Sequence, residues 1–163
     1  MSSVQKTSTA IINWLTSTSL SQLIQTTSWA IPGIQVVHIV CLATLFALAL
    51  NLSLRVAGWG LSAEPLASLA GRFVPAIWIC LAVLLLSGSL LIIAEPFRTI
   101  TNPVFYLKMS LLVAAIALTL WLASVARHRS KKPAPLHVAV AALSMLVWAG
   151  IIVAGRYIAY AEQ

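Results

Sequence analysis

Few residue types in this chain can take part in chemistry, and those that can fall near the ends of long apolar runs. His38, Glu95, Lys108 and Arg156 each lie within or beside such a run. A histidine can bind haem iron or a metal or exchange protons, and a cation can bind an anionic group such as a haem propionate. Polar groups are costly inside a membrane and often functional there. We therefore treat His38, Lys108 and Arg156 as a candidate cofactor-binding set.

Haem b and copper are the two cofactors that such a set could hold, and the residues favour neither. His38 and Met109 could form an axial pair on haem, whereas copper could use His38, Met109 and Cys41. His38 could also be a proton or quinone contact, or a hydrogen-bonded structural histidine. A bis-histidine haem within one chain is not expected, because His128 and His137 fall at the opposite end of the predicted helices.

The polar residues Gln35, Glu95 and Arg98 are expected at the same end of the predicted helices as His38. Together they predict a polar cluster on the outer side of the membrane. The alternative is purely structural, with Glu95 paired to Arg98, Lys108 or Arg156 so that the helix ends are tied together.

Composition identifies the class of protein that must position these groups. Of the 163 residues, 61% are hydrophobic and 8% charged, and the mean hydropathy is +0.99, far from the ~25% charged residues of soluble domains. Three acidic residues cannot supply the surface of a soluble hydrolase or nucleotide-binding enzyme. The ten Lys and Arg residues flank apolar runs, where lipid headgroups lie, so nucleic acid is not an expected partner.

The apolar runs predict an all-α integral membrane four-helix bundle. A helix needs about 20 apolar residues to cross the hydrocarbon core, and four segments meet that length. The predicted spans are about 34–54, 73–94, 104–126 and 136–158 within a transmembrane domain of residues 34–163. Cys41 is expected in the outer half of the first span and Cys80 in the inner half of the second. The two cysteines are therefore predicted to lie apart and to serve as small packing residues.

The segment 1–33 is too polar to cross, since it holds thirteen Ser or Thr residues up to Ala30. Ser19 followed by Gln22 resembles a capping box, and apolar residues then recur at helical spacing, which predicts an amphipathic helix at the membrane interface. Trp14 and Trp29 are expected at headgroup depth. Pro32 is expected to break the chain before the first span. The alternative is a disordered Ser/Thr-rich tail.

Positive charge sets the predicted orientation. Arg127, Arg129, Lys131 and Lys132 form a tight basic cluster in the connection between the third and fourth spans. Because cytoplasmic loops are enriched in Lys and Arg, this connection is expected in the cytoplasm, touching lipid headgroups, with both termini on the periplasmic side of a bacterial inner membrane.

Nearly the whole chain resembles a family of small, uncharacterised bacterial four-span membrane proteins. The first match is the run "SWAIPGIQVVHIVCLATLFALALNLSLRVAG", where a Trp, a Pro, a His and a Leu-Arg end follow the family pattern. The second is "SGSLLIIAEPFRTITNPVFYLKM", with its Asn-Pro-x-Phe turn and the Lys that opens the third span, and the third is "WAGIIVAGRYIAY". Gln35 and Ser53 stand where the family pattern has acidic residues, which weakens any proton or metal role of those positions.

The resemblance extends distantly to copper-resistance membrane proteins and four-helix b-type cytochromes. It implies that His38, Lys108 and Arg156 belong to one constellation, without implying an activity. The first functional hypothesis is a structural or accessory subunit of a larger membrane complex of redox type, with no catalytic activity of its own. The alternatives are a haem- or copper-binding protein using the outer site around His38, and an oligomeric pathway for a small solute. Membrane lipids and other membrane subunits, or copies of this chain, are the expected partners.

Overall fold

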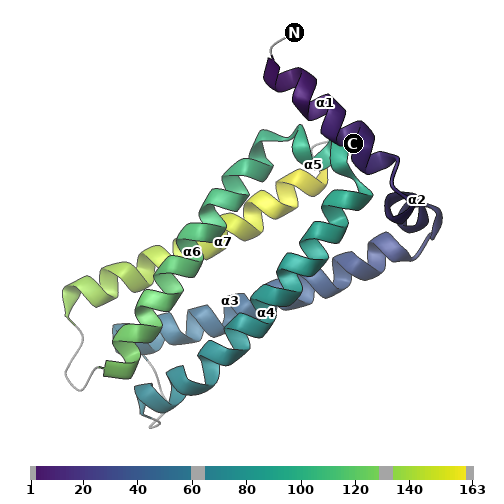
Figure 1. Ribbon diagram of the computed structural model, residues 1–163. Coiled ribbons are helices and arrows are strands. Elements are labelled where there is room, and N and C mark those ends of the chain that lie inside the picture. The colour runs from purple at the N-terminus through teal and green to yellow at the C-terminus, as the bar shows by residue number, and fades with distance from the viewer. Residues whose placement is uncertain (1–2, 60–64, 129–133, 161–163) are drawn as a thin grey trace.

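Seven helices make up the part of the chain that the structure describes, residues 3–59, 65–128 and 134–160 of a computed structural model (Figure 1). The helices, in order, are α1 (Ser3–Thr16), α2 (Ser19–Thr26), α3 (Ala30–Ala57), α4 (Leu66–Ala94), α5 (Pro96–Ile100), α6 (Pro103–His128) and α7 (Pro135–Tyr160). The described residues contain no strand, which confirms the predicted all-α class.

The four long helices α3, α4, α6 and α7 are each long and apolar enough to cross a membrane. One of them lies at each of the four predicted spans, but the first two helices begin earlier than predicted. α3 starts at Ala30 and α4 at Leu66, four and seven residues before the expected starts. The added residues, 30–33 and 66–72, are mostly apolar or small, so these two helices extend beyond the roughly 20 residues that a span needs.

Prolines mark most helix starts. Pro96, Pro103 and Pro135 are each the first residue of their helix, where the missing N–H has no intrahelical partner in any case. Pro32 lies in the first turn of α3 for the same reason, so it does not break the chain before the span as predicted. Pro75 lies in the interior of α4, nine residues after its start at Leu66.

The four long helices form a ring in which α3 packs on α4 and α7, and α6 packs on the same two helices (Figure 1). α3 and α6 also touch across the diagonal. The interior holds two apolar clusters stacked along the bundle, one around Leu52 and Leu122 and the other around Leu45, Ile77 and Trp148. The diagonal contact allows side chains from α3 and α6 to meet inside the bundle.

The N-terminal helices are docked onto one end of the bundle. Thr18 accepts a hydrogen bond from the backbone N–H of Ser21 and so caps α2, one residue before the predicted cap. The Ser21 hydroxyl donates to the Ile93 carbonyl at 2.8 Å, and the Gln25 amide donates to the Ala94 carbonyl at 2.8 Å. The last carbonyls of a helix lack intrahelical partners, so α2 supplies partners for the end of α4.

The end of the bundle where α4 finishes is covered by the short helices α1, α2 and α5. α1 packs against α5, and α2 against α4 and α3, at the end where α7 also finishes (Figure 1). Trp14 and Trp29 are 67% and 76% exposed there. A short helix in the N-terminal segment was predicted, and the structure contains two.

Candidate functional site

The centre of the candidate site is a hydrogen bond between His38 on α3 and Ser87 on α4. Nδ1 of His38 lies 2.9 Å from Oγ of Ser87. The same Oγ lies 2.7 Å from the carbonyl oxygen of Val83, one turn earlier on α4. Ser87 is 5% exposed and His38 is half-buried.

The number of protons available assigns the donor and the acceptor of the hydrogen bond between His38 and Ser87. A serine hydroxyl has one proton, and the carbonyl of Val83 can only accept, so the proton of Ser87 lies on the short contact to Val83. Oγ of Ser87 must then accept from His38, whose Nδ1 carries the ring proton. In the neutral imidazole the other nitrogen, Nε2, keeps its lone pair and can accept a hydrogen bond or bind a metal.

Gly88 provides room for this histidine. A Cβ atom at position 88 would lie 3.4 Å from Cε1 of His38, the carbon between the two ring nitrogens. A methyl group is at the limit of ordinary contact there, and a larger side chain would push the ring away from Ser87. The Ser87-Gly88 pair therefore holds the imidazole and gives it space.

Lys108 lies on α6, which contacts α3 across the diagonal of the bundle, within electrostatic range of His38. Its side chain reaches toward Gly155 on α7, where a Cβ atom would lie 3.7 Å from Nζ. In the part of the chain that the structure describes, the side chain of Lys108 makes neither a hydrogen bond nor an ion pair. Gly155 thus leaves space for the Lys108 side chain, as Gly88 does for the His38 ring.

Each of the four long helices contributes to this site, which we call the polar pair site: His38 and Lys108 with their neighbours Ser87, Gly88 and Gly155. At 1.5 Å per residue, His38, Ser87 and Lys108 lie about 12, 11 and 8 Å from the nearer ends of their helices. These depths agree with the sequence-based expectation that His38 and Lys108 lie at one level of the bundle.

Arg156, the third residue of the predicted cofactor-binding set, is exposed beside Gly155 on α7. Met109 follows Lys108 on α6 and is 40% exposed. Successive helical residues point about 100° apart, so Met109 faces outward where Lys108 faces inward. Cys41, half-buried, packs on the cluster of Leu45 and Trp148 one turn below His38. In the described residues, no group of three or more His, Cys, Asp or Glu side chains could hold a metal ion.

Glu95, Arg98 and Gln35 are the other polar residues predicted at this end of the bundle. Glu95 and Arg98 form an ion pair at 3.2 Å, one of the pairings expected under the structural alternative. Gln35 is exposed on α3. Glu95 is therefore engaged by Arg98, and no contact places its carboxylate on Lys108.

The two cysteines lie closer together than predicted. Cys41 on α3 and Cys80 on α4 both pack on the apolar cluster of Leu45 and Ile77. The prediction that they lie apart is therefore wrong, because the neighbouring helices α3 and α4 contribute both side chains to one cluster. Both thiols are free.

At the opposite end of the bundle, Arg127 is exposed in the last turn of α6. The other predicted headgroup contacts, Arg129, Lys131 and Lys132, lie outside the described residues. His137 accepts a hydrogen bond from the backbone N–H of Ala134 at 3.2 Å, which places it at the start of α7, far from His38 as predicted.

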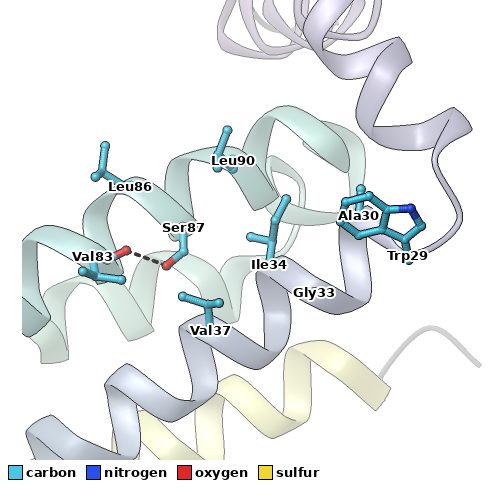
Figure 2. Close-up of a pocket in the computed structure, with 9 residues that line it drawn as sticks. All are labelled: Trp29, Ala30, Gly33, Ile34, Val37, Val83, Leu86, Ser87 and Leu90. Carbon is cyan, nitrogen blue, oxygen red and sulfur yellow. Dashed lines mark hydrogen bonds between the residues drawn. The ribbon is translucent and has the colours of Figure 1, made fainter.

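A groove of about 570 Å³ runs between α3 and α4 beside the polar pair site (Figure 2). All its lining residues except Ser87 are apolar or glycine. They are Trp29, Ala30, Gly33, Ile34, Val37, Val83, Leu86, Ser87 and Leu90. Ser87 therefore belongs both to the groove and, through its bond with His38, to the polar pair site.

Sequence reasoning singled out His38 and Lys108 as candidates but assigned no role to their neighbours Ser87, Gly88 and Gly155. The signal that could have found them is their depth, since each lies at the level of a polar residue on a neighbouring helix.

Comparison with protein-family models, curated proteins and solved structures finds no match to this chain.

Proposed function

We propose that this protein is a small subunit of a larger membrane assembly of redox type, and that the polar pair site is its contribution to that assembly. The single observation behind the proposal is the convergence of His38 and Lys108 inside an apolar bundle. Ionisable groups in a membrane are costly and usually face a functional site. Two glycines accommodate them, so the local sequence is adapted to hold the pair.

Both groups of the pair retain binding capacity. Nε2 of His38 keeps a lone pair, and the ammonium of Lys108 has no acidic partner in the described part of the chain. A purely structural pair would be expected to satisfy both groups internally, because unmatched polar groups are unfavourable in a low-dielectric interior. A partner subunit or a ligand that completes the site is consistent with this arrangement.

The experiment is purification in a mild detergent followed by native mass spectrometry and chemical crosslinking. We expect stoichiometric membrane partners, and we expect Lys108→Met to weaken their retention more than Arg127→Met, a cation removed from the other end of the same helix. A stable monomer with no partner in either measurement would contradict the subunit proposal.

Haem binding is a second candidate, favoured by the orientation of His38. Metal-bound histidines almost always donate their other ring N–H to a neighbouring group, and His38 donates Nδ1–H to Ser87. Nε2 of His38 would bind the iron, and Lys108 would be available to a propionate. Haem would supply one-electron chemistry, while this chain would orient the ligand and neutralise the carboxylate.

Copper fits less well than haem. The ammonium of Lys108 acts on His38 and repels a cation bound to Nε2, and Met109 faces outward. The test of both cofactors is an absorption spectrum with metal analysis of the purified protein. A Soret band that His38→Ala removes would support the haem candidate, and a colourless, metal-free sample after haem supplementation would eliminate it.

A further inference from the structure

The positive charge of Lys108 restricts what can occupy the polar pair site. Its Nζ lies against Gly155 inside the bundle, within electrostatic range of His38 and without an acidic partner in the described residues. A bound cation would be repelled, and a neutral group would leave the ammonium without a counter-charge. An anion satisfies this charge.

His38 restricts the occupant further. Because Nδ1–H is donated to Ser87, Nε2 can only accept a hydrogen bond while the ring is neutral. An occupant that reaches both groups therefore carries a negative oxygen for Lys108 and a proton-bearing oxygen for His38. Hydrogen phosphate, a phosphate monoester and a carboxylic acid–carboxylate group have this character, whereas chloride has no proton to donate.

We infer that the polar pair site binds an oxyanion group of this kind, held by the Lys108 ammonium and by Nε2 of His38. The inference rests on the proposed function in that it names the ligand of the same site. The oxyanion is either a soluble anion or the headgroup of an amphiphile. The apolar groove that shares Ser87 with the site offers a place for a hydrocarbon chain.

The test measures the melting temperature of the purified protein in detergent against increasing concentrations of phosphate, with sodium chloride at matched ionic strength as the reference. A ligand that binds the folded state raises the melting temperature with concentration. The second arm compares dodecyl phosphate with dodecanol, two molecules with the same chain length and different headgroups.

Lys108→Met is expected to weaken binding about tenfold to a hundredfold, the loss that corresponds to one charge-assisted hydrogen bond. Arg127→Met removes a cation from the other end of α6 and is expected to leave binding unchanged. Lys108→Arg keeps the charge and is expected to retain binding within a few-fold. If Lys108→Met does not fold, Lys108→Gln replaces it.

A response to phosphate that Lys108→Met removes supports a soluble oxyanion, and a response to dodecyl phosphate alone supports an amphiphile headgroup. A response that persists in Lys108→Met, or that chloride reproduces in full, overturns the inference, as does the absence of any response. Loss of the copurifying partners without loss of oxyanion binding would instead contradict only the subunit proposal.

Discussion

The indole N–H of Trp148 on α7 donates a hydrogen bond to Oγ1 of Thr119 on α6 at 3.1 Å, and Trp148 is only 1% exposed. Oγ1 of Thr119 in turn donates to the carbonyl of Ala115 at 2.7 Å. Trp148 is the largest fully buried side chain of the described residues. Its polar edge therefore depends on one hydroxyl group in the centre of the bundle.

Thr119→Val is expected to lower the free energy of unfolding by about 1–3 kcal/mol, because it leaves the buried indole N–H without an acceptor. The measurement is reversible unfolding in mixed micelles. In the background of Trp148→Phe, which has no N–H, the same change should cost clearly less. Equal costs in the two backgrounds would show that the hydrogen bond does not contribute.

Ser87→Ala removes the acceptor of the His38 ring proton. We expect ¹⁵N-histidine NMR of the wild-type protein to show neutral His38 with the proton on Nδ1, and the variant to lose this preference. Ser89→Ala is the matched control, since the Ser89 hydroxyl is exposed and donates to the Leu85 carbonyl. A wild-type spectrum with the proton on Nε2 would refute the assigned hydrogen-bond direction.

Ser144→Ala is expected to leave stability unchanged or to raise it by up to about 1 kcal/mol. Ser144 is fully buried on α7, and its hydroxyl has no hydrogen-bond partner among the residues that the structure describes, so removing it abolishes a desolvation penalty. Thermal unfolding in detergent measures the effect. A clear drop in melting temperature would mean that the hydroxyl has a partner in the membrane-embedded protein.

The double variant Ser21→Ala, Gln25→Ala is expected to release α2 from the end of α4, because it removes both side-chain donors to the Ile93 and Ala94 carbonyls. Limited proteolysis should then cleave the N-terminal segment faster, with the four long helices intact. The variant Gln22→Ala, on the exposed side of α2, should be cleaved at the wild-type rate. Equal rates for all three proteins would contradict the role of these bonds.

The four spans were predictable because membrane helices are constrained by hydrocarbon thickness, which long apolar runs reveal directly. Helix ends were less predictable: α4 begins at Leu66 because the residues before Phe73 can be helical without being strongly apolar. The convergence of His38 and Lys108 was predicted from depth alone. The role of Ser87 was not, because it depends on which face of α4 packs against α3, and four spans with low amphipathicity do not define those faces from the sequence.

The attachment of α2 also constrains the order in which this protein can assemble. Ser21 and Gln25 find their partners 72 and 69 residues later in the chain. At synthesis rates of about 5–20 residues per second, the N-terminal helices are made about 4–14 s before the end of α4 exists. During that interval α2 has no docking site, and it can take its native position only after the second long helix has been made, so a segment synthesised before the four long helices is among the later ones to reach its final place.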